Sequence, residues 1–343
     1  MPVMVDQTDS ISSDMYCKRC DYPLNDLDSS SCPECGRAFS AHDPRTFRKR
    51  PGRRWLRKLF RVVVVLSVLI VIPTTWYGWK AHRFLQVTEW IEKQGGRFRA
   101  SDQNVWLNDR LVALGLPRLR QITHVTLTNC TIYDDDLIRL RGLTHLRSLF
   151  LTGTQVGDAG LVHLKDMTQL KDLYLTRTQV SDTGLVHLKG MTLMEDLHLQ
   201  ATQVSDAGLV HLKDMIQLED LNLLDTRVGD AGLIHLKGMT QLESLTLSRT
   251  RVSDAGLVHL KGMTWLQRFS IGGKQVTDAG LVHLEGMTQL KLLVLSGSQV
   301  SDAGLVHLMG LNRLAELRLH DTKVSLEGIK ALKQALPNCR VER

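Results

Sequence analysis

The sequence predicts an α/β fold: a repeat solenoid with a parallel inner sheet and short outer helices, preceded by one transmembrane helix and a small cysteine module. Three observations in the 343-residue chain predict it. Four of the six cysteines lie between residues 17 and 35, an uncharged apolar run fills residues 62–79, and a 24-residue pattern repeats over most of the remaining chain. The bulk composition, 43% hydrophobic and 23% charged, is ordinary and decides little.

The cysteine module covers residues 15–40 and follows a segment, residues 1–14, that we expect to be flexible. It contains two CxxC pairs separated by eleven residues: Cys17, Cys20, Cys32 and Cys35. Two such turns bring four thiolates within tetrahedral reach of one Zn2+, and four cysteine ligands leave no open coordination position, so a zinc ribbon with a structural metal is predicted. Two disulfides are the competing interpretation. The cytoplasmic location inferred below keeps thiols reduced and favours the metal.

A transmembrane helix is predicted over residues 62–79, because 18 uncharged residues span roughly 27 Å, enough for the hydrocarbon core of a bilayer. A buried core helix is the alternative, but Arg61 and Lys80 close the run sharply. The preceding basic juxtamembrane segment, residues 41–61, contains nine Lys/Arg and no acidic residue from Arg45 onward. The positive-inside rule therefore places the N-terminus in the cytoplasm and the repeats outside it, in a single-pass protein of the cell membrane. The run lies too far along the chain for a cleavable signal peptide.

The repeat region covers residues 119–343, about nine units with a C-terminal cap, and residues 80–118 are expected to form the N-terminal cap. The unit reads LxxLxLxxTxVxDxGLxxLxxM. Its first part alternates with the period of a strand, whereas two later leucines, such as Leu185 and Leu188, lie three apart as on one face of a helix. A unit of strand, turn and helix cannot bury its apolar side alone, so the units stack into a solenoid.

An Asp-x-Gly pair recurs every 24 residues, with a His five residues after the Asp. We expect the aspartates to be structural helix N-caps, whose carboxylates accept hydrogen bonds from the first turn of the helix that they precede. A catalytic site is needed once, whereas this pair occurs seven times, so the pair indicates a scaffold and the protein is not expected to be an enzyme. The predicted caps are Asp158, Asp182, Asp206, Asp230, Asp254, Asp278 and Asp302.

The repeat pattern resembles the leucine-rich repeat family, in a 24-residue variant with Thr where Asn or Cys is common. It is similar to the arrays of F-box proteins and of ribonuclease inhibitor. The order of cysteine pairs, basic segment, membrane helix and repeats also resembles a group of bacterial membrane-anchored leucine-rich repeat proteins. The resemblance implies a leucine-rich repeat solenoid that binds a protein partner, and it brings no catalytic residues. The N-terminus contains no F-box-like helical segment, which argues against a substrate-recruiting adaptor.

Ligand-binding residues are expected on the concave face, where the outward strand positions vary from unit to unit while the scaffold positions do not. Aromatic or imidazole side chains in three adjacent strands, beside an acidic group, are typical of a protein-contact patch. Neutral variation on a solvated sheet face is the alternative interpretation. The predicted concave residues are Phe150, Tyr174, His198, Asn222, Thr246, Arg318, Glu195, Glu219 and Glu243.

The predicted function is a non-enzymatic, membrane-anchored protein-binding scaffold that recognises a protein or cell-envelope ligand. A transmembrane regulator, whose cytoplasmic zinc ribbon contacts protein or nucleic acid, is the alternative. The net charge is +7, but the nine basic residues from Arg45 to Arg61 leave about −2 for everything else. The repeats are therefore not expected to bind nucleic acid. The sequence does not indicate an oligomeric state.

Overall fold

The computed structural model describes residues 15–48 except 21, 26, 28, 29 and 41, then residues 53–102, residues 108, 109 and 113, and residues 120–343. Within residues 53–102, the side chains of 53–58, 66–75 and 77 are not included. The predicted flexible segment, residues 1–14, lies outside this set, as does most of the predicted cap beyond residue 102. The chain divides into two compact units, residues 1–80 and 81–343.

The first unit contains a small core built around the cysteines. Strand β1 (Tyr16–Cys17) pairs antiparallel with β2 (Phe47–Arg48), and the apolar side chains Leu24, Phe39 and Phe47 are buried with Cys17 and Cys32. So few apolar residues bury little surface, and a domain of this size normally needs a metal or disulfides to fold.

Helix α1 (Arg53–Lys93) contains the whole segment predicted to cross the membrane, residues 62–79. Among the described residues, no helix combines the length and the apolar character that a membrane span requires. The side chains of 66–75 and of Tyr77, which form much of the predicted segment, lie outside the described ones. The transmembrane helix therefore stays a prediction.

The second unit begins with the last turns of α1, which cover one end of the solenoid. Val87, Trp90 and Ile91 are buried there in the same core as the repeats. The chain then reverses at Gly95, whose φ of +78° is left-handed, and enters β3 (Arg97–Asp102). β3 pairs antiparallel with β4 (Arg120–Thr126), so that α1 and β3 together shield the core of the first repeat.

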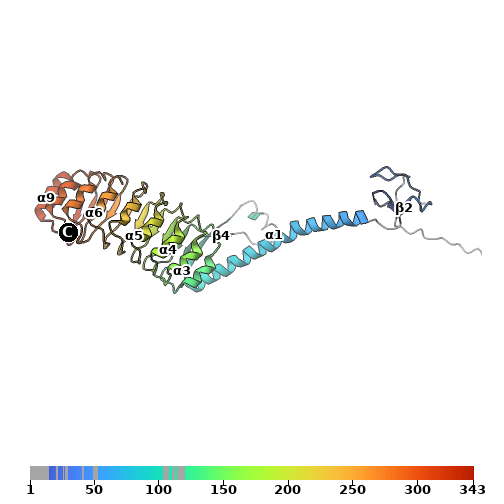
Figure 1. The fold of residues 1–343 in the computed structure, drawn as a ribbon, viewed down its shortest axis with the longest axis horizontal. Helices are drawn as coiled ribbons and strands as arrows, with labels where there is room; N and C mark the ends of the chain where they lie inside the picture. The colour runs from blue at the N-terminus through green and yellow to red at the C-terminus, as the bar shows by residue number, and fades with distance from the viewer. Residues whose placement is uncertain are drawn as a thin grey trace, which may run out of the picture. The chain divides into compact units, whose positions relative to one another are not determined.

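The repeats form one sheet whose eleven strands follow each other in sequence order (Figure 1). From β4 to β13 all pairs are parallel and in register at the 24-residue offset, as in Leu173 opposite Leu197. The remaining strands are β5 (Ser148–Phe150), β6 (Asp172–Tyr174), β7 (Asp196–His198), β8 (Asp220–Asn222), β9 (Ser244–Thr246), β10 (Arg268–Ser270), β11 (Leu292–Val294), β12 (Glu316–Arg318) and β13 (Arg340–Glu342).

Short helices return the chain behind the sheet. In most repeats one α-helical turn continues into a 3-10 turn, and both rest on leucines such as Leu185 and Leu188, which are completely buried. The α-helical turns are α3 (Asp158–Leu161), α4 (Asp182–Leu185), α5 (Asp206–Leu209), α6 (Asp254–Leu257), α7 (Asp278–Leu281) and α8 (Asp302–Leu305). The 3-10 turns are η1 (Asp134–Leu140), η2 (Val162–Leu164), η3 (Val186–Leu188), η4 (Val210–Leu212), η5 (Gly232–Leu236), η6 (Val258–Leu260), η7 (Val282–Leu284) and η8 (Val306–Leu308), and a longer helix, α9 (Leu326–Ala335), ends the array.

A tight turn follows each strand and fixes the path to the helix. The Thr178 hydroxyl donates to the Leu175 carbonyl over 2.6 Å, and Arg177 before it has a left-handed φ of +56°. The repeat that has Lys274 at the threonine position differs from the others. Within residues 120–343, which are fully described, its Gly273 is the turn residue that lacks the left-handed φ.

Candidate functional site

The repeated aspartates do not cap their own helices, which corrects the prediction. Asp182 is the first helical residue of α4, and Ser181 before it takes the N-cap position. The carboxylate of each aspartate instead accepts the backbone N–H of the residue 23 positions later, which lies just before the next helix, over 2.6 to 2.9 Å. The pairs are Asp158 with Ser181, Asp182 with Ser205, Asp206 with Gly229, Asp230 with Ser253, Asp254 with Thr277, Asp278 with Ser301 and Asp302 with Ser325.

Stacking of the repeats explains the correction. The free N–H groups at the start of one helix lie beside the carboxylate of the preceding repeat, because the repeats are stacked in register. The same carboxylate lies where a Cβ of the next glycine would be, as Asp134 Oδ1 does at 2.6 Å from the Cβ position of Gly160. The Asp-x-Gly pair is thus a contact between repeats.

The outward face of the sheet, which is predicted to be concave, carries a stack of three rings. Phe150, Tyr174 and His198 lie opposite one another on β5, β6 and β7. The ring centroids of Phe150 and Tyr174 are 4.6 Å apart, and those of Tyr174 and His198 are 4.1 Å apart. Each of the three side chains is half-buried, so the stack is both fixed and accessible. The structure therefore brings together the three aromatic or imidazole residues that the sequence singled out.

A row of carboxylates runs beside this stack. Asp172, Asp196 and Asp220 lie opposite one another on β6, β7 and β8, two residues before the row of rings. The sequence places these aspartates in the acidic group beside the rings, but the predicted ligand-binding residues were the glutamates one residue earlier. The strand period of two indicates that each aspartate shares a face with the side chain two residues later, as Asp172 does with Tyr174.

The three carboxylates differ in their partners. Asp172 accepts from the Ser148 hydroxyl, and Asp220 lies 3.6 Å from His198 Nε2 and 3.4 Å from Arg268 Nη2. Among the described residues, no hydrogen bond or ion pair is found for the Asp196 carboxylate. Burial and the neighbouring carboxylates raise the pKa of Asp196. Asp220 is buried too, which by itself raises its pKa, but bonds from His198 and the nearby charges hold that pKa below its usual value.

The electrostatic field of this row reaches the ring stack. Burial, together with the negative charges of Asp196 and the other two aspartates, raises the pKa of Tyr174 to about 12. The phenol is neutral at physiological pH and remains a hydrogen-bond donor. The patch thus presents apolar rings with a hydroxyl beside negative charge.

The other predicted concave residues lie outside the stack of rings. Asn222 and Thr246 continue the row of rings on β8 and β9, and the Asn222 side chain accepts from Leu224 N–H at 3.0 Å. Glu195 pairs with Lys171, while Glu219 and Glu243 are exposed at the strand starts.

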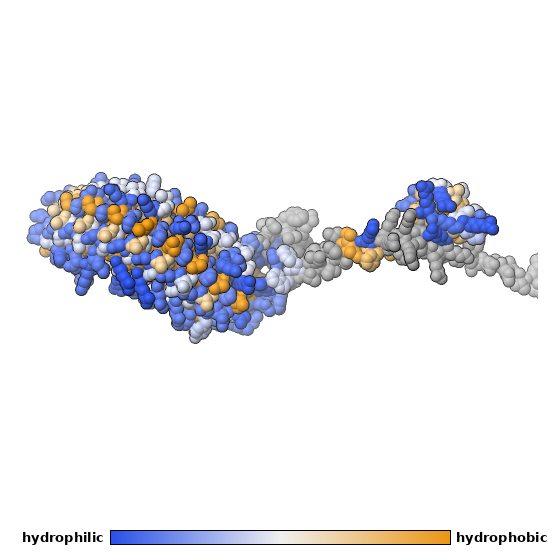
Figure 2. All heavy atoms as spheres, viewed as in Figure 1, coloured by the Kyte–Doolittle hydropathy of each residue, from blue (hydrophilic) through white to orange (hydrophobic). Residues whose placement is uncertain are grey.

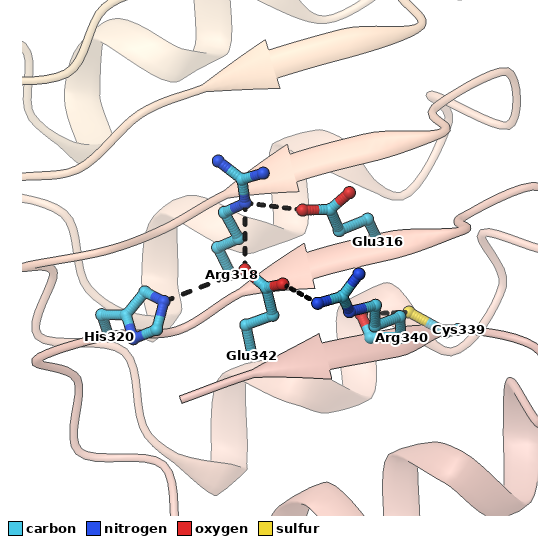
Figure 3. A network of polar contacts seen from close by, with 6 residues as sticks. All are labelled: Glu316, Arg318, His320, Cys339, Arg340 and Glu342. Carbon is cyan, nitrogen blue, oxygen red and sulfur yellow. Dashed lines mark hydrogen bonds and ion pairs between the residues drawn. The ribbon is translucent and has the colours of Figure 1, made fainter.

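Arg318 lies away from the patch, on β12. It belongs to a network at the C-terminal end of the sheet, where its Nε contacts Glu316 at 2.6 Å and Glu342 at 3.3 Å (Figure 3). Glu342 also pairs with Arg340 at 2.7 Å. Seven strand spacings of about 4.8 Å separate Arg318 from Phe150, so one small ligand cannot contact both.

The four predicted metal ligands form one cluster in the first unit. The sulfur atoms of Cys17, Cys20, Cys32 and Cys35 all lie within 4.8 Å of one another. Each CxxC pair forms a tight turn, and Gly36 closes the second with a left-handed φ of +68° and an N–H that donates to the Cys32 carbonyl. Such a cluster could hold one metal ion, and its all-thiolate donor set with no disulfide fits a tetrahedral ion.

The thiols of Cys17 and Cys20 differ widely in pKa, although they lie in the same cluster. Burial raises the pKa of Cys17, but backbone N–H groups of Arg19 and Cys20 outweigh it and lower the pKa to about 7. Burial and the neighbouring thiols raise the pKa of Cys20 to about 12. Without a cation, repulsion between neighbouring thiolates opposes the loss of all four thiol protons. A bound cation would offset that repulsion.

Comparison with known proteins finds one family model and several similar solved structures. Residues 142–164 match the family model described as Leucine Rich repeat, and no curated protein matches the chain. Similar solved structures include an internalin from Listeria monocytogenes str. 4b F2365, 19% identical over 70% of this chain and 88% of that chain, with a TM-score of 0.40. Internalin C2 from the same strain is 20% identical over 67% and 89%, with a TM-score of 0.41. A leucine-rich repeat protein of Leptospira interrogans is 15% identical over 61% and 57%, with a TM-score of 0.43.

The chain therefore carries leucine-rich repeats, and they build a solenoid with a parallel sheet and short helices. The unit matched at 142–164 is one of the repeats that follow each other at the same offset as far as β13. The presence of leucine-rich repeats, predicted from the sequence, is confirmed. The resemblance to the membrane-anchored bacterial group stays a prediction.

Proposed function

We propose that the protein is a non-enzymatic scaffold whose concave sheet face recognises a protein or cell-envelope ligand. The observation that carries the proposal is the stack of Phe150, Tyr174 and His198 beside the row of three aspartates. Fixed rings supply contact area at little entropic cost, and the carboxylates favour a partner that brings basic groups. Leucine-rich repeat domains as a class serve as protein-binding scaffolds, which agrees with this proposal.

The test compares two positions in the same row of the sheet. Tyr174→Ala removes the centre of the stack, while Val294→Ala shortens a side chain in the same row on β11, outside the stack and outside the predicted binding residues. Both full-length variants and the unaltered protein are used to capture partners from the cell envelope, with quantitative mass spectrometry as readout. A partner kept by Val294→Ala and lost by Tyr174→Ala supports the proposal. If both variants keep the same partners as the unaltered protein, this face is not the binding surface.

Membrane anchoring is the second part of the proposal. Residues 62–79 are proposed to span the membrane, with the basic segment and the N-terminus in the cytoplasm and the repeats outside. Support comes from the uncharged sequence and from the charge bias around it. Tags at both termini and protease added to intact and outer-permeabilised cells test the orientation. A protected N-terminal tag and a C-terminal tag cut from outside the inner membrane are expected, and the reverse pattern would contradict the proposed orientation.

The cysteine cluster is proposed to hold a structural Zn2+ that folds the N-terminal module. A transmembrane regulator is the second candidate function, favoured by the presence of this separate module beyond the predicted membrane segment. Cys17→Ser distinguishes the two functions. Loss of ribbon folding with unchanged ligand capture supports the scaffold, and loss of a downstream response while capture persists supports the regulator.

A further inference from the structure

One hydrophobic side chain in each repeat remains accessible on the helical side of the solenoid. It begins the 3-10 turn in every case but Ile234, which lies inside η5. Its exposed fraction lies between 38% and 54% in six repeats: Val162, Val186, Ile234, Val258, Val282 and Val306. Val210 occupies the same position and is partly buried. Figure 2 shows hydrophobic residues following one another across the repeats that Figure 1 labels α3 to α6. The solenoid thus has an apolar ridge outside its core.

A row of lysines accompanies this ridge. Five exposed lysines lie three residues after the hydrophobic residue, and therefore on the same helical face: Lys165, Lys189, Lys213, Lys237 and Lys261. Within the described part of the chain, none of the five has an acidic partner within 4.0 Å. Glu285 and Met309 replace the lysine in the last two of these units. The apolar ridge and the row of lysines therefore occur together in the repeats between Val162 and Lys261.

Two larger apolar side chains add to this surface. Ile216 follows Lys213 by three residues and is 57% exposed, and Trp265 follows Lys261 by four and is 64% exposed. Both lie on loops that lead from the helical side back to the sheet. Lysine, tryptophan and aliphatic side chains together are typical of proteins that lie in a membrane interface.

Comparison between repeats indicates that the ridge serves a purpose outside the core. Exposed positions on the sheet have diverged, as Phe150, Tyr174, His198 and Asn222 show. The exposed position of the ridge is Val or Ile in all seven units. Both positions recur once in each unit, so uniformity at only one of them points to a constraint of its own. A row that presents the same groups in every unit matches a partner that is uniform along its length.

We infer that the helical face between Val162 and Lys261 lies on an anionic lipid surface. Acyl chains are uniform and accept the apolar ridge, while anionic headgroups complement the lysines. A second copy of the chain is a poorer occupant, because its own lysine row would face the first. The inference rests on the proposed membrane anchoring, which would keep the solenoid near a bilayer and leave the concave face free for a ligand.

The test uses the full chain reconstituted in vesicles. One set contains phosphatidylcholine alone, and the other also contains roughly one third phosphatidylglycerol. After flotation, a membrane-impermeant amine reagent labels accessible lysines, and peptide mass spectrometry measures each one relative to Lys291 on the sheet face. Labelling of the five row lysines is expected to fall roughly threefold or more on the anionic vesicles only, since lysines are drawn to that surface.

Two sets of variants separate lipid contact from general charge attraction. Val186→Asn with Ile234→Asn removes part of the ridge beside lysines and should abolish the protection. The matched control, Val282→Asn with Val306→Asn, lies where lysines are absent and should preserve it. Lys189→Gln with Lys237→Gln, which leaves the packing untouched, should weaken protection of the remaining three lysines even if the ridge variant misfolds. Protection that survives loss of the ridge would indicate charge attraction to the headgroups without contact of the ridge with the lipid, and would overturn the inference.

The outcomes also distinguish this inference from the anchoring on which it rests. Flotation with both vesicles but equal labelling overturns the lipid contact and leaves the anchor standing. Flotation with anionic vesicles only, with protected row lysines, supports the contact and contradicts the anchor. Flotation with neither contradicts both, and protection that extends equally to Lys291 overturns the assigned face.

Discussion

The carboxylate of Asp182 accepts two hydrogen bonds from Ser205 in the next repeat, one from its backbone N–H at 2.7 Å and one from its hydroxyl at 2.5 Å. The same pair of bonds recurs between Asp278 and Ser301. Each aspartate thereby fixes the start of the following helix against its own. Since every repeat touches only its neighbours, such contacts set the energy of each interface in the array.

Removing this carboxylate should weaken one repeat interface. We expect Asp182→Ala to lower the free energy of unfolding by about 2 kcal/mol, because partly buried donors lose a charged acceptor. Denaturant unfolding measures the loss. In a double-mutant cycle, Ser205→Ala added to Asp182→Ala should cost much less than Ser205→Ala alone. Additive losses would contradict direct coupling of the two side chains.

The glycine of the Asp-x-Gly pair should be nearly irreplaceable. A Cβ on Gly208 would collide with Asp182 Oδ1 and lie 3.0 Å from Leu185 Cδ1. Gly208→Ala should therefore destabilise the solenoid by roughly 1–3 kcal/mol through overpacking. Gly190→Ala is the matched control, since nothing lies within 4 Å of its Cβ position. Equal melting temperatures for the two variants would show that the close approach is absent.

The pKa of Tyr174, about 12, should be measurable by ultraviolet difference titration against Tyr174→Phe. The raised pKa means that the unfolded chain loses this proton first, near pH 10, so the phenol's contribution to stability is complete below pH 10 and is lost as pH rises to about 12. Asp196→Asn should move the pKa of Tyr174 downward, because it removes one of the negative charges. A titration that Asp196→Asn leaves unchanged would show that this charge does not act on the phenol.

Metal content tests the cysteine cluster. The purified chain is expected to bind one Zn2+, and chelation should unfold the N-terminal module and expose four thiols to a colorimetric reagent. Cys32→Ser should lose the metal, whereas Cys130→Ser should retain it, because Cys130 lies in the repeats. If Cys32→Ser and the unaltered protein bind equal zinc, the cluster does not hold the metal.

The main features of the fold were predictable because they are periodic. The alternation around Leu173 and Leu175 and the spacing of Leu185 and Leu188 directly encode which sides are buried, and these leucines are completely buried. The concave row from Phe150 to His198 followed from the same period. The carboxylates of Asp172, Asp196 and Asp220 were recognised as part of the acidic group but not predicted as ligand-binding residues, because their individual partners lie on neighbouring strands, 24 residues away in sequence.

By itself the sequence determined the repeat, its strand and helix, the face that each side chain occupies and the set of four cysteines that cluster. These features depend on local periodicity and on residue chemistry. The tertiary structure alone decided which groups the repeated aspartates serve. A carboxylate at the start of a helix satisfies local N–H groups in an isolated helix, but in the stacked array the donors of the next repeat lie within its reach. Stacking in register creates that proximity, and no pattern within one repeat contains it.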